Sequence, residues 1–95
     1  IHNKQWVKYG RQFTYHFTGK TGFKILGSKS NLKKVVVSKK ELWCPAKRVQ
    51  AGDQLIKIDD ETLDGGFNQA KFLLQDRVNR NIPFKVIFFR KFTQV

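Results

Sequence analysis

The chain has few of the features that mark exported or membrane-spanning proteins. It contains a single cysteine, Cys44, which excludes an internal disulfide and leads us to expect a reducing, cytoplasmic location. No apolar run approaches the roughly 20 residues that cross a bilayer, and the first residues lack the apolar core of a signal peptide. Because the chain opens with Ile1 rather than methionine, we expect it to be part of a longer, multi-domain protein.

Acidic side chains are also scarce, and none lies in the first part of the chain. There are 19 Lys and Arg against 7 Asp and Glu, a formal net charge of +12, and residues 1–40 contain no acid. Such a charge attracts nucleic acid, anionic lipid or acidic protein segments in a salt-dependent way. Charge alone does not choose among these partners, and it is equally compatible with lysines that form ordinary solvated faces.

Proline is scarce as well, whereas apolar and aromatic residues are not. The chain has two prolines, a hydrophobic fraction of 40% and an aromatic fraction of 14%, with nine phenylalanines. This composition is typical of a globular chain rather than a disordered one. A length of 95 residues predicts one compact domain with a single, modestly stable core.

Short alternating runs of apolar residues predict most of the chain to be β-structure. Phe13, Tyr15 and Phe17 share one face of the first such run. The last run follows Pro83 and is apolar on both faces, which is typical of a covered, central strand. The predicted strands are residues 12–18, 23–27, 35–37, 55–58 and 84–89, with a short return at 62–63.

One amphipathic helix is predicted, over residues 67–78. Its apolar positions are Ala70, Leu73, Leu74 and Val78, and no β-branched residue precedes Val78. On a helix that begins near residue 67, Ala70 and Leu73 point toward the sheet.

A second, shorter helix is the most that the segment 41–49 allows, because Pro45 limits it to a turn or two. The order of elements is therefore three strands, a short helix, two strands, the main helix and a last strand. This order predicts an α+β fold.

Several segments, taken in sequence order, carry a more specific pattern. They are Lys20-Thr21-Gly22-Phe23, Val35–Lys39, Pro45-Ala46, Gly52-Asp53-Gln54-Leu55-Ile56-Lys57-Ile58-Asp59-Asp60, Phe67–Leu74 and Phe84–Arg90. In this order they resemble the carboxylate loop, third strand, first helix, glycine–aspartate segment, second helix and closing strand of the PDZ family of peptide-binding domains.

The resemblance covers residues 13–91 and implies the fold and the domain boundaries. The fold would be a small, partly open antiparallel β-barrel or sandwich of five to six strands, capped by one main helix and one short helix. Residues 1–12 would form an N-terminal extension and residues 92–95 a tail.

Two departures from the family pattern are visible. The family usually has a glycine and a leucine where this chain has Lys20 and Thr21, so the lid over the terminal-residue pocket is partly polar here. The chain between Pro45-Ala46 and Gly52-Asp53 is also shorter than in the family, which would reduce the first helix to a turn.

The glycine of the loop has two possible explanations. The resemblance implies that the N–H groups of Thr21, Gly22 and Phe23 receive the C-terminal carboxylate of a partner peptide, with Lys20 as a nearby cation. The alternative is an ordinary glycine turn between two strands, without a ligand.

The resemblance also implies a peptide groove beside the second strand. The peptide would add a strand along the edge formed by Lys24, Ile25 and Leu26, and the helix would form the opposite wall. Leu74 fits the groove and the core equally well. The groove residues are Lys24, Ile25, Leu26, Phe67, Lys71 and Leu74, and the lysines Lys29, Lys33 and Lys34 form a possible patch for an anionic partner.

The residue at the start of the helix predicts the ligand class. A histidine in this place of the family binds a Ser or Thr hydroxyl of the ligand, and Phe67 cannot accept such a bond. We therefore expect ligands that end in hydrophobic-x-hydrophobic, with acidic residues upstream that suit the nearby lysines.

No catalytic, metal or cofactor site is predicted. The consecutive acids Asp59, Asp60 and Glu61 are typical of a solvated turn, and Cys44 and Trp43 of packing. Three functions remain: a module for partner C-termini, an electrostatic adaptor on anionic lipid or nucleic acid, and a structural unit of a larger assembly whose groove is unused.

Overall fold

The computed structural model describes residues 10–27 and 34–91. The elements are β1 (Gly10–Phe17), β2 (Phe23–Gly27), β3 (Val35–Lys40), β4 (Gln54–Ile58), β5 (Glu61–Thr62), α2 (Gly66–Arg80) and β6 (Phe84–Lys91). The predicted order of strands and of the main helix is confirmed. No helix of these residues is long and apolar enough to cross a membrane.

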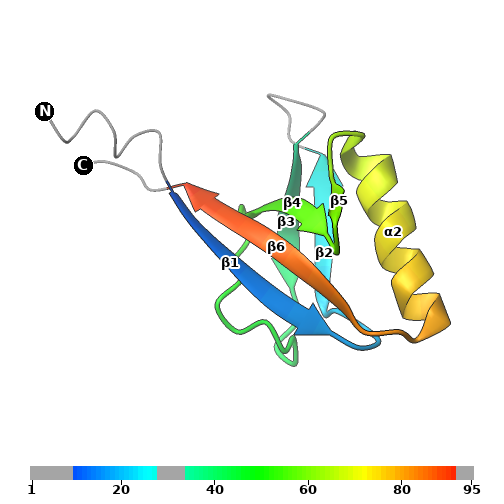
Figure 1. Ribbon diagram of the computed structural model, residues 1–95. Coiled ribbons are helices and arrows are strands. Elements are labelled where there is room, and N and C mark those ends of the chain that lie inside the picture. The colour runs from blue at the N-terminus through cyan, green and yellow to red at the C-terminus, as the bar shows by residue number, and fades with distance from the viewer. Residues whose placement is uncertain (1–9, 28–33, 92–95) are drawn as a thin grey trace, which may run out of the picture.

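The strands form one antiparallel sheet that is not closed into a barrel. Their order is β1-β6-β4-β3-β2, and β5 pairs with β4 outside this path. Among the described strands β2 therefore ends the sheet, with β3 as its one neighbour, and α2 runs beside it (Figure 1). The predicted α+β fold of six strands and one main helix is confirmed, and it leaves the β2 edge open.

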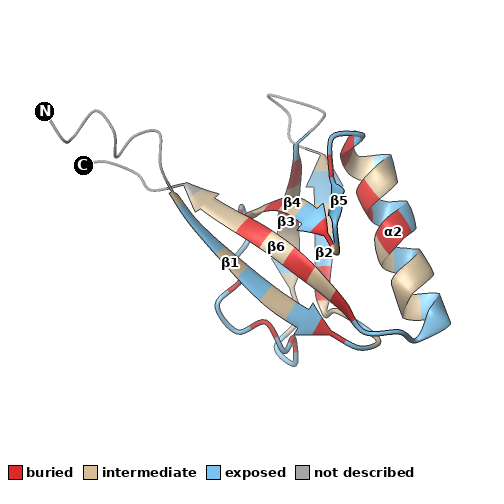
Figure 2. Cartoon of the chain, viewed as in Figure 1, coloured by how far each residue is buried: buried red, intermediate tan, exposed pale blue. Residues whose placement is uncertain are grey.

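The core is built around β6, which lies between β1 and β4 as its two apolar faces predicted. Phe84, Val86 and Phe88 alternate along it as buried residues (Figure 2). The ring of Phe84 stacks on Phe17 with centroids 5.6 Å apart, and that of Phe88 meets Phe23 edge-on at 5.6 Å. This aromatic cluster joins β1 and β6 to β2, whose first residue opens the candidate site.

Several elements begin or end one to three residues away from the predicted bounds, among them β1, β3, α2 and β6. Strand β1 begins at Gly10, inside the expected extension 1–12, because residues 10–12 pair with residues 89–91 of β6. Arg11 and Gln12 are polar and exposed, so no alternation of apolar residues predicts this pairing from the sequence. The helix α2 continues beyond residue 78 to Arg80, and Asn81 ends it with a φ of 53°.

The short helix expected near Pro45 is absent, and turns take its place between β3 and β4. The Cys44 N–H donates to the Glu41 carbonyl at 3.1 Å and the Val49 N–H to the Ala46 carbonyl at 3.2 Å. Pro45 cannot donate a backbone bond, and the segment is too short to fit a helix between these turns. Cys44, Ala46 and Val49 are nevertheless fully buried, so the segment closes one end of the core.

An ion pair between the buried Asp53 and the partly exposed Arg90 fastens this turn segment to the sheet. The Asp53 side chain is 4% exposed and accepts bonds from Nε and Nη2 of Arg90, both at 2.8 Å. Asp53 also accepts from the Gln50 N–H at 2.9 Å, and Arg90 donates to the Arg48 carbonyl. The bonds to Asp53 raise the pKa of Arg90 above its ordinary value. Arg90 further lies over the Phe13 ring, 5.3 Å from its centroid.

We expect Asp53→Ala to lower the free energy of unfolding by about 2–3 kcal/mol, because it leaves the Gln50 N–H and the Arg90 guanidinium without their buried acceptor. Urea unfolding followed by circular dichroism measures the change. The matched control is Asp60→Asn, since Asp60 is exposed in a turn. Equal, small effects of both substitutions would contradict the structural role of the pair.

Candidate functional site

A groove of about 670 Å³ runs between the open edge of β2 and the helix α2. We call it the β2–α2 groove. The predicted site residues that line it are Lys20, Thr21, Gly22, Phe23, Lys24, Ile25, Phe67, Lys71 and Leu74. The structure thus brings the predicted loop, strand and helix positions together along one surface.

The loop of residues 20–23, at one end of the groove, is held by hydrogen bonds from the turn that follows β3. The Thr21 carbonyl accepts from Sγ of Cys44 at 3.1 Å, and the Gly22 carbonyl from the Glu41 N–H at 2.7 Å. In a trans peptide the N–H points opposite to the carbonyl. The N–H groups of Gly22 and Phe23 therefore point away from Cys44 and Glu41, as a loop that receives an anion requires.

Gly22 is required there for two reasons. Its φ is +80°, a conformation that side chains disfavour, and a Cβ at this position would lie 2.8 Å from Cα and 2.9 Å from Cβ of Cys44. The backbone thus needs both the left-handed conformation and the absent side chain to approach Cys44. The glycine between Thr21 and Phe23 is explained by this close approach as well as by the turn.

The floor of the groove is apolar and continuous with the core. Phe23 is buried, and Ile25 and Leu74 are partly buried against the core while they line the groove. Leu74 therefore belongs to both the groove and the core, the two alternatives that the sequence left open. Ala70 and Leu73 are buried on the face of α2 toward the sheet, as predicted.

Three of the residues that line the groove are lysines. The Lys71 ammonium lies 5.9 Å from the centroid of the Phe67 ring, and Lys20 and Lys24 line the loop and the strand. Lys24 lies directly opposite Lys39 of β3, and both are exposed. Like charges in this position repel each other, and neither lysine forms an ion pair within the described residues.

The remaining predicted residues lie outside the groove or outside the described chain. Leu26 belongs to β2 but does not line the groove, and its side chain is 54% exposed. It lies opposite Val36 of β3. Because side chains alternate between the two faces of a strand, it points to the other face from Ile25. Lys34 is exposed just before β3, while Lys29 and Lys33 lie outside the described residues.

Sequence reasoning missed five residues of the groove, which are Glu41, Trp43, Gln75, Val78 and Asn79. Val78 follows Leu74 by one helical turn, so its place could have been read from the helical period. Trp43 was assigned to packing: it lies against the loop, where its Cζ3 atom would be 3.1 Å from a Cβ on Gly22, but it remains 55% exposed and lines the groove. No pattern in the sequence indicates that the turn carrying Trp43 contacts the loop around Gly22.

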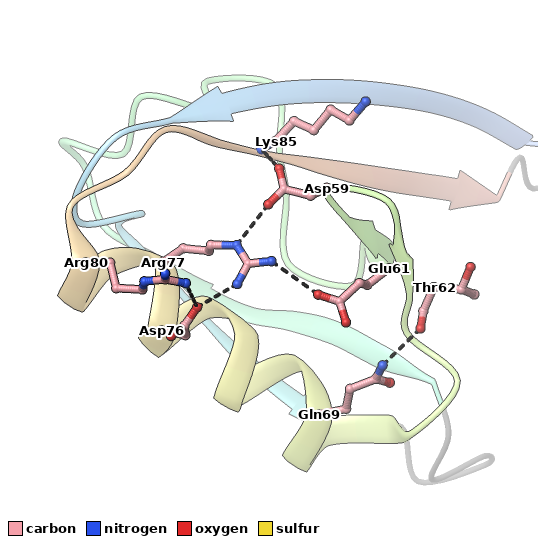
Figure 3. A network of polar contacts seen from close by, with 8 residues as sticks. All are labelled: Asp59, Glu61, Thr62, Gln69, Asp76, Arg77, Arg80 and Lys85. Carbon is pink, nitrogen blue, oxygen red and sulfur yellow. Dashed lines mark hydrogen bonds and ion pairs between the residues drawn. The ribbon is translucent and has the colours of Figure 1, made fainter.

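The far side of α2 is anchored by Arg77, whose side chain is 15% exposed (Figure 3). Its guanidinium donates to Asp59 at 2.9 Å, to Glu61 at 3.2 Å and to Asp76 at 2.6 Å. Two of the acids that the sequence assigned to a solvated turn thus hold the helix to β4 and β5. No cluster of potential metal ligands occurs in residues 10–27 and 34–91.

The network makes the ionised form of Asp59 the stable one. Partial burial opposes ionisation, but bonds from Arg77 and from the Lys85 N–H, with the charges of both side chains, hold the pKa of the Asp59 carboxyl below its ordinary 3.8. A carboxylate with a lowered pKa in the folded state stabilises the fold above its ordinary pKa. This contribution decreases as the pH falls from there through the lowered value.

We therefore expect Asp59→Asn to lower the free energy of unfolding by about 1 kcal/mol near neutral pH, and by less near pH 3. Urea unfolding of both proteins at the two pH values measures this difference. A gap between the two proteins that is the same at both pH values would contradict the role of the Asp59 charge.

Two glycines of the same loop region separate conformation from contact. Gly19 has a φ of +84° and no atom within 4 Å of the place that a Cβ would take, whereas Gly22 has a φ of +80° and the contact with Cys44. Gly19→Ala should cost about 1–2 kcal/mol of stability for the conformation alone. Gly22→Ala should cost a further 1–3 kcal/mol, roughly the penalty of overpacking. Thermal or urea unfolding of the two variants measures both losses of stability. Equal losses would mean that Cys44 moves aside without cost and that its contact with Gly22 is not a constraint.

Comparison with known proteins identifies the fold. No protein-family model and no curated protein matches the sequence. A solved structure that is similar is the Dlg1 PDZ2 domain of the choanoflagellate Monosiga brevicollis, with a TM-score of 0.64 and 16% identity over 84% of this chain and 99% of that one. The chain therefore has a PDZ-like fold, as its sequence motifs predicted.

Proposed function

We propose that this domain is a non-enzymatic interaction module that binds the C-terminal segment of a partner protein in the β2–α2 groove. The observation that carries the proposal is the loop geometry: the Thr21 and Gly22 carbonyls are bonded inward, so that two successive N–H groups point outward at the end of an apolar groove. Bonds from such groups to a carboxylate are stronger than bonds between neutral groups, about 1.5–3 kcal/mol each.

The open edge of β2 gives the partner a second means of binding. A peptide that extends β2 as a new antiparallel strand pairs its backbone with groups that have no partner strand on that side within residues 10–27 and 34–91. Its side chains then alternate between the groove and the outer face. The last and third-from-last side chains share the groove, against Phe23, Ile25 and Leu74 at one end and Phe67 toward the other.

The side chains of the groove set the ligand preference. Phe67 has no atom that accepts a hydrogen bond, so an apolar third-from-last residue fits it better than Ser or Thr. Lys24 and Lys71 on the rim favour acidic residues upstream, and Glu41 is the one acid among the lining residues. The proposed ligands therefore end in hydrophobic-x-hydrophobic and carry acidic residues upstream of this ending. We further propose that the module acts in the cytoplasm as part of a longer protein.

An acidic peptide that ends in Val-x-Val should bind the domain in the micromolar range, as judged by an NMR titration, while its C-terminally amidated twin binds at least about tenfold more weakly because one charged acceptor is lost. Shifts are expected in Thr21–Ile25 and Phe67–Leu74. Equal affinity for acid and amide would contradict carboxylate capture by the loop.

The same titration tests the role of Phe67. A peptide with Thr in the third-from-last place should bind the natural domain more weakly than the Val peptide, and Phe67→His should reverse this order because its imidazole can accept the hydroxyl bond. The exposed substitution Phe72→His, on the outer face of the same helix, is the matched control. A natural domain that prefers the Thr peptide would contradict the proposed preference.

A further inference from the structure

The turn after β3 carries the most exposed large apolar residue of the described chain. Leu42 is 99% exposed and the neighbouring Trp43 is 55% exposed. The turn is held in place, because the Cys44 N–H donates to the Glu41 carbonyl at 3.1 Å and Cys44 itself is fully buried. We call these two residues the Leu42–Trp43 tip. They are presented to solvent by a fixed backbone rather than by a fraying end.

Lysines lie on the segments next to the tip. The Lys40 ammonium donates to the Lys47 carbonyl at 3.0 Å, and the Lys47 ammonium lies 3.4 Å from the Leu42 carbonyl. Lys20 lines the groove together with Trp43, and Lys39 is exposed one residue before Lys40. None of these four lysines forms an ion pair within residues 10–27 and 34–91. The tip therefore has several lysines near it, and Glu41, which directly precedes Leu42, is the neighbouring acid.

We propose that the Leu42–Trp43 tip inserts into the headgroup region of an anionic bilayer while the surrounding lysines bind lipid phosphates and carboxylates. Two side chains are too few for a stable protein interface, which usually buries about 800 Å² on each partner. They are enough to anchor a domain at a bilayer surface when basic residues contribute about 1 kcal/mol each. Tryptophan suits this depth because its ring is apolar and its N–H remains near water.

The proposal does not depend on peptide binding. Leu42 does not line the β2–α2 groove, so its replacement separates the two activities. Leu42→Ser should leave the affinity for the Val-x-Val peptide unchanged and weaken binding to vesicles of phosphatidylcholine and phosphatidylserine about tenfold, the loss expected for one buried leucine. Vesicles of phosphatidylcholine alone should not bind at physiological salt.

The experiment is a vesicle co-sedimentation series with the whole chain. Lys40→Glu combined with Lys47→Glu should also weaken binding about tenfold or more. The matched controls are Phe72→Ser and Lys57→Glu, which change an exposed aromatic and an exposed lysine elsewhere and should have no effect. In a Trp6→Phe background, the emission of Trp43 should shift to the blue when vesicles are added.

Three results would overturn the proposal. The first is no binding to anionic vesicles. The second is an unchanged vesicle affinity of Leu42→Ser, which would mean that charge alone attracts the bilayer. The third is a short DNA duplex that binds as tightly as the vesicles and is indifferent to Leu42→Ser, which would assign the positive surface to nucleic acid.

Discussion

The candidate site depends on one close contact, between the backbone of Gly22 and the turn from Glu41 to Cys44. This contact orients two peptide units of the loop, and it is possible only because Gly22 has no side chain and Cys44 has a small, buried one. The chain that follows this turn is fixed to the sheet by the Asp53–Arg90 pair, through the Gln50 N–H and the Arg48 carbonyl. A loop that binds an anion with backbone groups needs such support, because a flexible backbone would lose entropy on binding.

The opposite wall of the groove has its own support on the far side of the helix. Ala70 and Leu73 set the distance of α2 from the sheet by packing, whereas Arg77 fixes its position along the sheet through acids of the β4–β5 turn, of β5 and of the helix itself. The two walls are thus held by separate sets of contacts, neither of which occupies the groove. The apolar floor between them remains open to solvent along the β2 edge.

The sequence predicted those parts of the fold that local patterns determine. Alternating residues located the strands, and the helical period placed Ala70 and Leu73 on the buried face. The start of β1 at Gly10 escaped prediction because its pairing is made by backbone bonds of exposed residues. The position of Trp43 could not be predicted for a different reason. It depends on how the turn after β3, which has no periodic pattern, packs against the loop before β2, which is distant in sequence. The role of Asp59 and Glu61 likewise needed the position of Arg77, which only the tertiary structure supplies.

The facing lysines Lys24 of β2 and Lys39 of β3 have a consequence for solubility. An open strand edge that accepts a peptide is also a template for the same edge of a second copy. Two copies joined antiparallel along β2 would bring their Lys24 side chains onto one ladder, beside Lys39 of each copy. The resulting row of positive charges opposes self-association, whereas an incoming acidic strand neutralises it. The same two residues therefore disfavour pairing with a second copy and would favour the acidic strand that is proposed as the ligand.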